Sequence, residues 1–171
     1  MTDLFLKSDA TFSACRAYRY LLWRIWEPRR PLALFVMLNP SIAGRAGNDP
    51  TSRRCIAYAT AWGCGGVLQA NLYALRSAAP QVLALHPDPV GPDNDAVLGE
   101  AARRTRDGGG RVLAAWGADP AVAAREAEVL KILAAGGRLD CLRQTMAGHP
   151  AHPLYLPAGL APRPFAWRAV A

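Results

Sequence analysis

Short, uninterrupted apolar runs recur along the chain, and each stops at a glycine, a proline or a polar residue. Runs of this length without polar alternation are typical of strands that are buried on both faces, as in a parallel sheet. The clearest such run is residues 32–38, and further strands are expected at 67–75, 111–117 and 139–146. The aromatic-rich segment 17–26 predicts a further strand, and Arg19 and Arg24 within it favour an edge position or a solvated face.

Helical segments separate most of these strands. Asp49 suits an N-cap and Pro50 the first helical position, so the sequence predicts a helix that begins there and is ended by Gly63. Further helices are expected from Asp93 or Asn94 to about Arg106, and from Asp119-Pro120 to Gly136-Gly137, with a short extended piece at 154–156. This alternation indicates one three-layer α/β/α domain, residues 1–171 with a core at about 17–167, around a mostly parallel sheet.

Ligands in parallel α/β sheets bind beyond the carboxyl ends of the strands, so the residues after each apolar run are the first site candidates. Asn39-Pro40-Ser41 ends the most hydrophobic run, and the proline favours an extended Asn39 that can hold a water or a substrate oxygen. A turn that merely closes the strand is the alternative. Asn71 lies inside a predicted strand, where its amide either matches the edge of a base such as uracil or bonds a neighbouring loop.

Two later segments also end near the same edge of the predicted sheet. Trp116-Gly117 closes a strand, and the glycine permits either the close approach of a ligand or only a tight turn. His152, in GHPAHPLYLP, can stabilise negative charge on a departing base, and His149 competes with it for this role. Because neither histidine has a carboxylate or cysteine at ligand spacing, no metal site is predicted. The alternative for both is polar surface.

The net charge of +7 comes from 20 basic residues against 13 acidic ones, and all the basic residues except Lys7 and Lys131 are arginines. Arginine forks suit phosphates and planar bases, which agrees with a nucleic-acid or nucleotide partner, although a GC-rich genome gives the same bias. Arg53 and Arg54 stand in the first turn of a predicted helix, where the dipole attracts phosphate. A solvated helix face explains them equally well.

Composition limits the remaining classes. Hydrophobic residues form 51% of the chain, and no run approaches the roughly 18 apolar residues of a membrane span, so no membrane partner is expected. The start, MTDLFLKSDATFS, lacks the pattern of a secretory signal, which predicts a cytoplasmic protein. Cys15, Cys55, Cys64 and Cys141 form no CxxC pair and are expected as small core residues. No cofactor is predicted, and the sequence makes no prediction of the oligomeric state.

Six segments occur together in a fixed order: LFVMLNPS, NDPTSRRCIAYATAWG, NLYALRS, DPVGPDND, AAWG and HPLYLP. Over roughly residues 17–167 the chain resembles a family of bacterial and phage proteins known as a domain of unknown function. The order of strand ends is also similar to that of the uracil-DNA glycosylase superfamily. There, a Gly-x-Asn-Pro-Gly or Gly-x-Asp-Pro motif, an Asn on the next strand, a strand ending in Leu-Gly and a His-Pro-Ser loop follow one another. The corresponding residues here are Asn39-Pro40-Ser41, Asn71, Trp116-Gly117 and His152-Pro153-Leu154.

The second resemblance implies a uracil-DNA-glycosylase-like fold that cleaves the C–N glycosidic bond of a uracil-like or modified base, flipped from DNA. Asn71 would bind the base edge, Asn39 would hold a water beneath the sugar, and His152 would stabilise the departing base. The other residues that it implies are Pro40, Ser41, Tyr73, Arg76, Trp116 and Gly117 around the substrate, Tyr58 or Tyr73 stacked on the base, Arg53, Arg54 and Arg76 on phosphates, and Leu154 and Tyr155 as a wedge in the base stack.

The sequence departs from that superfamily in three places. Ser41 replaces the last glycine of the first motif, where it would crowd a sugar or phosphate, and Leu154 replaces the serine of the histidine loop. Asn39 leaves the first loop without an acidic base. The four cysteines also do not match the iron–sulfur branches. Two alternatives therefore stay open: a non-catalytic nucleotide or nucleic-acid binder on the same fold, and an enzyme of free modified nucleosides. A redox or metal protein is the least supported class.

Overall fold

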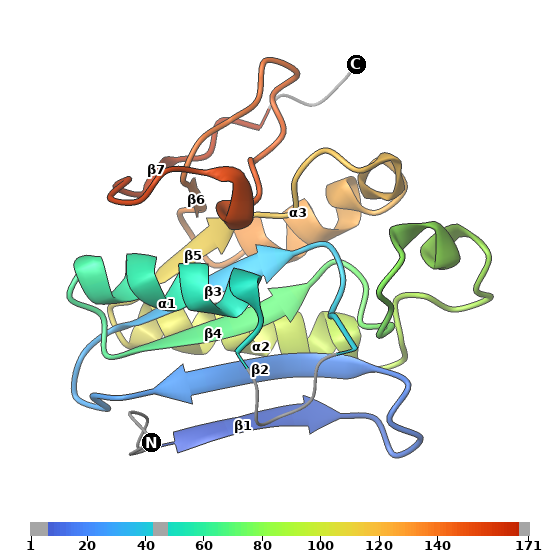
Figure 1. The fold of residues 1–171 in the computed structure, drawn as a ribbon, viewed down its shortest axis with the longest axis horizontal. Coiled ribbons are helices and arrows are strands. Elements are labelled where there is room, and N and C mark those ends of the chain that lie inside the picture. Colours follow the sequence, from blue (N-terminus) through green and yellow to red (C-terminus); the bar gives the residue numbers. More distant parts are fainter. Residues whose placement is uncertain (1–6, 43–47, 168–171) are drawn as a thin grey trace.

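A seven-stranded sheet forms the centre of the computed structural model, which describes residues 7–42 and 48–167 (Figure 1). In chain order the strands are β1 (Lys7–Phe12), β2 (Arg19–Ile25), β3 (Leu32–Met37), β4 (Gly66–Asn71), β5 (Arg111–Ala114), β6 (Asp140–Cys141) and β7 (Arg163–Pro164). In space they lie in the order β1-β2-β4-β3-β5-β6-β7. The four strands β4, β3, β5 and β6 are parallel, whereas β1, β2 and β7 pair antiparallel with their neighbours. The α/β class is confirmed, but the sheet is mixed rather than mostly parallel.

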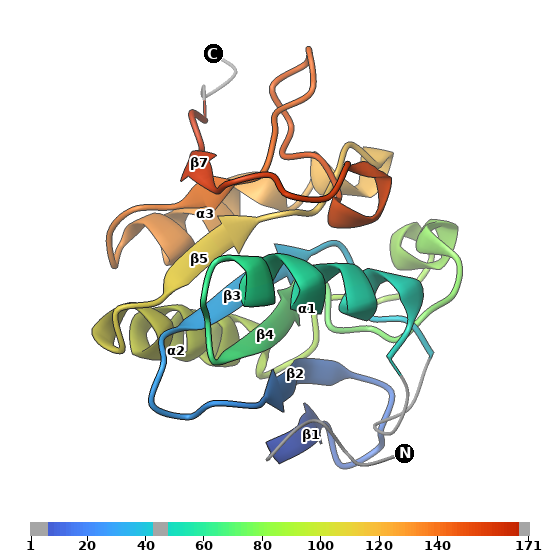
Figure 2. The same ribbon diagram turned by 60° about the vertical axis from the view of Figure 1, so that its left-hand side comes forward.

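Helices cover both faces of this sheet. They are α1 (Pro50–Ala61), α2 (Asn94–Asp107) and α3 (Glu126–Ala134), with 3-10 helices η1 (Pro80–Ala84), η2 (Pro120–Val122) and η3 (Pro153–Tyr155). Figures 1 and 2 show α1 on one face and α2 and α3 on the other. Alternate residues of β3 point to the two faces, so that Phe35 and Met37 pack beneath α1, whereas Leu34 and Val36 join the core under α2 and α3. Among the described residues, no helix is long and apolar enough to span a bilayer.

The first helix is the best-predicted element of the chain. The Asp49 carboxylate accepts a hydrogen bond of 2.7 Å from the Ser52 amide, and Pro50 occupies the first turn. Gly63 follows the helix with a φ of 75°, a conformation that glycine adopts without steric cost. The cap places the start of α1 at the carboxyl ends of β3 and β4 (Figure 2).

The prediction for segment 17–26 was wrong in its position within the sheet. β2 is an inner strand, because β1, which the hydrophobic pattern does not reveal, pairs with it on one side and β4 on the other. Arg19 and Arg24 are buried, with exposed fractions of 5% and 2%. Arg24 donates to the Asn48 side-chain oxygen at 3.0 Å and to the Trp23 carbonyl at 2.8 Å. A guanidinium with such acceptors can be buried, so two arginines in a strand do not establish an edge.

Three later predictions also need correction. The helix expected after Asp119 is broken into η2 and α3, with Arg125 between them. The strand expected at 139–146 is reduced to β6, after which the chain forms a hairpin in which the Thr145 amide donates to the His149 carbonyl at 2.8 Å. Of residues 154–156 only Leu156 is extended, because Pro153 begins η3, which runs to Tyr155. Of the four cysteines, Cys15 is exposed while the other three are buried.

Two buried side chains fix the end of β4. Asn94, at the start of α2, donates from its amide nitrogen to the carbonyls of Asn71 and Leu72, each at 3.1 Å. Arg125 also donates to the Leu72 carbonyl at 3.1 Å, and its guanidinium forms ion pairs with Asp95 and Glu128. These bonds satisfy the Asn71 and Leu72 carbonyls at the end of β4, so they fix the backbone position of Asn71.

We expect Asn94→Ala to lower the free energy of unfolding by about 2 kcal/mol, because it removes two buried hydrogen bonds and leaves a carbonyl without a partner. Urea denaturation followed by circular dichroism measures the change. Asp107→Ala, at the exposed end of the same helix, is the control and should cost less than about 0.5 kcal/mol. Equal losses in the two variants would contradict the role given to Asn94.

Candidate functional site

A pocket of about 340 Å³ opens at the carboxyl ends of β3 and β4, between the start of α1 and η3. This volume lies at the lower end of the range for small-molecule sites. Many of the predicted site residues line it, namely Asn39, Ser41, Asn71, Trp116, Gly117, His152 and Tyr155. Side chains that the sequence did not assign to a site line it as well, namely Arg19, Asp49, Thr51, Gln69 and Asp119. Strand ends that are distant in sequence therefore meet at one cavity.

Asp49 brings a carboxylate into the pocket. Its two oxygens accept hydrogen bonds from the Ser52 amide at 2.7 Å and from the Ser41 hydroxyl at 2.9 Å. Burial alone would raise the pKa of this half-buried carboxyl, but these bonds and the positive charge of Arg19 outweigh burial and bring its pKa below the ordinary value. Asp49 is therefore ionised at neutral pH. Ser41, which stands in the place of a glycine in the glycosylase motif, anchors this group.

Arg19 supplies the balancing positive charge. Its side chain reaches the pocket from β2 and is 5% exposed. Burial lowers its pKa to about 10, and Arg76 and Arg24 act in the same direction, whereas Asp49 opposes them. The guanidinium remains protonated at neutral pH. The buried Arg19 and the carboxylate of Asp49 thus line the same small cavity, together with Asp119, so the site offers charge of both signs.

Gln69 and Asn71 stand two positions apart on β4 and point to the same face of the sheet. Both are buried, with exposed fractions of 3% and 2%, and both line the pocket. The Gln69 nitrogen and the Asn71 oxygen have no hydrogen-bond partner within the described residues. Buried polar groups are rarely left so, and such exceptions call for an explanation. The loop partner considered for the Asn71 side chain does not exist within those residues.

His152 is the histidine of the pocket. Its Nδ1 accepts a hydrogen bond from the Leu154 amide at 3.3 Å, so in the neutral ring the proton lies on Nε2. Burial lowers the His152 pKa, and the negative charge of Asp49 partly opposes this shift. At neutral pH the ring is an uncharged donor. His149, the competing candidate, lies outside the pocket, with Nδ1 3.9 Å from the Glu126 carboxylate.

Trp116 and Gly117 form a wall of the pocket beside the histidine loop. The Trp116 indole is 1% exposed and donates to the Glu126 carboxylate at 2.8 Å. Gly117 has a φ of 78°, and its amide donates to the Pro150 carbonyl at 2.9 Å. A side chain at position 117 would be strained by this φ and would meet the His152 Cβ at 3.6 Å. The glycine therefore lets the strand end and the histidine loop lie together.

Asn39 closes the turn after β3 with its amide nitrogen and keeps its side-chain oxygen for another partner. Its amide nitrogen donates to the Ser77 carbonyl at 3.0 Å and more weakly to the Pro40 carbonyl at 3.3 Å, so it does close the loop after β3. Its side-chain oxygen accepts no hydrogen bond within the described part of the chain, and the residue lines the pocket. That oxygen can therefore accept from a water or a ligand hydroxyl.

Several predicted residues lie elsewhere. Tyr73 is buried beneath η2, where its hydroxyl donates to the Ala121 carbonyl at 2.8 Å. Arg76 binds the carbonyls of Arg16 and Ile42 and lies over the Phe12 ring. Tyr58 is a core residue whose hydroxyl donates to the Pro157 carbonyl at 2.5 Å. Pro40, Arg53, Arg54 and Leu154 also fall outside the pocket lining.

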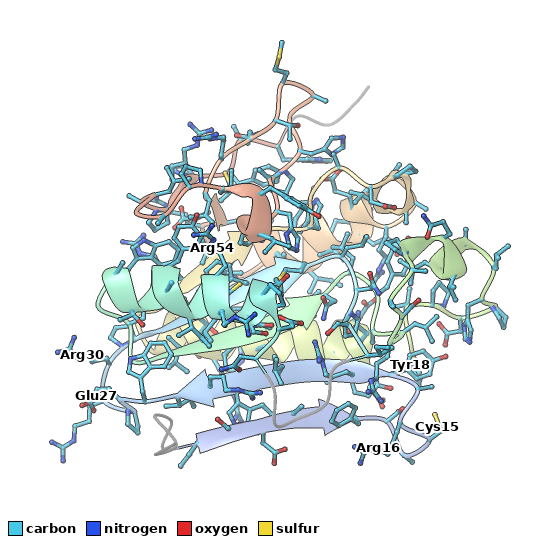
Figure 3. All side chains as sticks on the ribbon, in the orientation of Figure 1. Cys15, Arg16, Tyr18, Glu27, Arg30 and Arg54 are labelled. Carbon is cyan, nitrogen blue, oxygen red and sulfur yellow. The ribbon has the colours of Figure 1, made fainter. Side chains whose placement is uncertain are left out.

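Arg54 and Tyr155, two of the predicted site residues, lie on the surface. Arg54 lies on the side of α1 that faces the C-terminal segment (Figure 3). The positive charges of Arg54 and Arg143 both lower the pKa of Tyr58, but burial dominates and raises it. The two arginines therefore flank the same core residue, although one follows β6 and the other is on α1. Tyr155 is 83% exposed at the pocket mouth, with its ring 5.6 Å from that of His152.

Within the residues that the structure describes, no group of three or more His, Cys, Asp or Glu side chains is arranged to hold a metal ion.

Comparison with protein families gives the class of the chain. A family model described as a protein of unknown function, DUF1643, matches residues 19–154. The chain therefore belongs to the DUF1643 family. No curated protein and no solved structure matches it significantly.

Asp49→Asn should lower the pKa of His152 further, because the variant removes the negative charge that opposes the effect of burial. NMR titration of the imidazole signals measures this pKa in wild type and variant. The same spectra report the tautomer, for which we expect a proton on Nε2 in the neutral ring. An unchanged or raised pKa in the variant would contradict the arrangement of the two groups in one pocket.

Proposed function

We propose that the pocket binds an uncharged nucleobase and hydrolyses the C–N glycosidic bond that joins it to a sugar. The observation that carries this proposal is that a carboxylate, a neutral histidine and two polar strand residues line one small cavity, Asp49, His152, Gln69 and Asn71. The resemblance of the strand ends to uracil-DNA glycosylases supports it. The carboxylate that the Asn39 loop lacks is supplied by Asp49, from the start of α1.

Each group has a part in the proposed reaction. The Asn71 amide hydrogen-bonds the edge of the base. Asn39 and the ionised Asp49 lie towards the sugar, where they orient a water and stabilise the positive charge that develops as the glycosidic bond breaks. The base departs with the electron pair of the C–N bond while the Nε2–H of His152 donates a hydrogen bond to it; the water then adds to the anomeric carbon, its proton passes through Asp49 to solvent, and the released base anion takes up a proton from solvent. Because His152 is neutral, it stabilises that anion by a hydrogen bond rather than by transfer of a proton from an imidazolium.

The charge balance of the pocket favours a base over a phosphate as the group that enters it. The ionised Asp49 at the start of α1 offsets both the helix dipole and Arg19, which would otherwise attract an anion. Phosphates are better placed on the surface outside the pocket, where Arg54 and Arg143 lie near Tyr58. A DNA strand is therefore the proposed substrate, with the exposed Tyr155 against a neighbouring base.

A binding protein without turnover is the second candidate, and one observation favours it. Both Asp49 oxygens already accept hydrogen bonds, one as the cap of α1. A carboxylate used in this way is a weaker base than a free one, because the bonds stabilise its ionised form. Such a protein would bind the same bases and release them unchanged. Free nucleosides are the alternative substrate for an active enzyme.

The test is incubation of the pure protein with duplex and single-stranded oligonucleotides that carry uracil, hypoxanthine, hydroxymethyluracil or a G·T mismatch, and with the free nucleosides. Abasic sites are read by alkaline strand scission, and released bases by chromatography. We expect release of a base, and a loss of at least about 100-fold in rate in Asp49→Asn and in His152→Ala, because each removes a group that acts in the transition state.

Two matched variants control for non-specific damage. His149→Ala removes a histidine outside the pocket, and Asp107→Asn neutralises an exposed carboxylate of α2; both should retain wild-type rates. If no substrate releases a base, but a gel shift with uracil-containing DNA weakens in Asn71→Ala, the binding protein is the correct function. If release proceeds equally in His152→Ala, the proposed site is wrong.

A further inference from the structure

Two polar atoms of β4 are buried at the pocket without partners among the described residues, and they differ in chemical character. The Gln69 Nε2 is a donor and the Asn71 Oδ1 is an acceptor. The Asn71 amide nitrogen likewise makes no hydrogen bond within that part of the chain. A buried strand tolerates such groups only at a cost in stability, so their presence in the wall of a cavity indicates that a ligand supplies the missing partners.

Ser52 engages one end of the Gln69 amide. The Ser52 side chain is 1% exposed, and its hydroxyl donates to the Gln69 Oε1 at 3.1 Å. Ser52 is itself fixed, because its backbone amide donates to the Asp49 cap. The oxygen of Gln69 is thereby engaged with α1, and its nitrogen is left as the free group. In this orientation the Gln69 side chain offers a hydrogen-bond donor to the cavity.

We propose that Gln69 is a second recognition residue of the pocket and that, together with Asn71, it selects cyclic imides. The free groups of the two side chains are a donor from Gln69 and the oxygen and nitrogen of the Asn71 amide, and we take them to meet a ligand in the order donor, acceptor, donor. The complementary ligand edge is C=O, N–H, C=O on consecutive atoms. Uracil, thymine and other 5-substituted uracils carry this edge, as does xanthine, whereas cytosine offers an amino group and a ring acceptor in its first two places.

This inference rests on the proposed nucleobase site and names its substrate class, but it concerns binding and does not need turnover. It gives a role to the fact that Gln69 and Asn71 point to the same face of β4. Residues i and i+2 of a strand lie on one face, so a single flat ring in the pocket can contact both. The two residues then share recognition of the ring edge, and neither amide alone is sufficient to distinguish an imide from an amino-substituted ring.

The experiment is an NMR titration of the ¹⁵N-labelled protein with three free bases, uracil, cytosine and N3-methyluracil, in which the central N–H is blocked. In the wild type, we expect uracil to bind at least about tenfold more tightly than either of the others, as for the loss of a buried hydrogen bond. Gln69→Met, which keeps length but removes the donor, should weaken uracil about tenfold and leave cytosine unchanged. Gln69→Glu, which keeps an acceptor for Ser52, should move the preference towards cytosine.

Gln81→Met is the matched control, because Gln81 is exposed on η1 outside the pocket and should retain the wild-type preference. Thermal unfolding checks that each variant is folded. An unchanged ratio of uracil to cytosine affinity in folded Gln69→Met would overturn the role of Gln69, and so would tighter binding of cytosine, or no binding of uracil, by the wild type. Selective binding of uracil without base release would support this inference and refute the proposed hydrolysis. Base release combined with the same ratio of uracil to cytosine affinity in wild type and Gln69→Met would support the hydrolysis and refute this inference.

Discussion

The candidate site depends on the attachment of one helix to the ends of two strands. Asp49 caps α1 with one carboxylate oxygen and holds the loop after β3, through Ser41, with the other. The same short segment places Ser52 against Gln69 of β4. Helix caps are worth about 1 kcal/mol, which is small beside the core, but this one also sets the distance between the two walls of the pocket. A shift of α1 along its axis would break the contacts of Asp49 with Ser41 and of Ser52 with Gln69 at the same time.

The elements that follow from local rules are predictable from the sequence. The cap at Asp49, the glycine after α1, and the buried strands β3, β4 and β5 are all marked by spacing and hydrophobicity. The same pattern indicates that β3, β4 and β5 run parallel, and parallel strands bring Asn39, Asn71 and Trp116 to one edge of the sheet. The outermost antiparallel strand β1 carries no such signal, because it is partly polar and is recognisable only through its partner β2.

Two of the site residues that the sequence did not reveal share one cause. The pattern explains Asp49 fully as a cap and Arg19 as part of a solvated strand, so it points to no second role for either. A residue can serve the backbone and the cavity at once, and the burial of a charge becomes evident only when its partners are placed. Gln69 differs, because a signal exists: it is a polar residue in the same apolar run as Asn71, two positions away and hence on the same face. Tyr73 and Arg76 do not line the pocket, because the chain leaves the sheet after Asn71 and their side chains contact other segments.

The unpartnered amide atoms of β4 have a consequence for the empty protein. Each is a buried polar group without a partner among the described residues, so a fitting ligand adds hydrogen bonds that the rest of the folded chain does not supply. A compound of a few heavy atoms can then raise the melting temperature by more than its size suggests. A thermal-shift screen of small heterocycles therefore suits this protein, because it detects binding in the pocket whether or not the protein cleaves a bond.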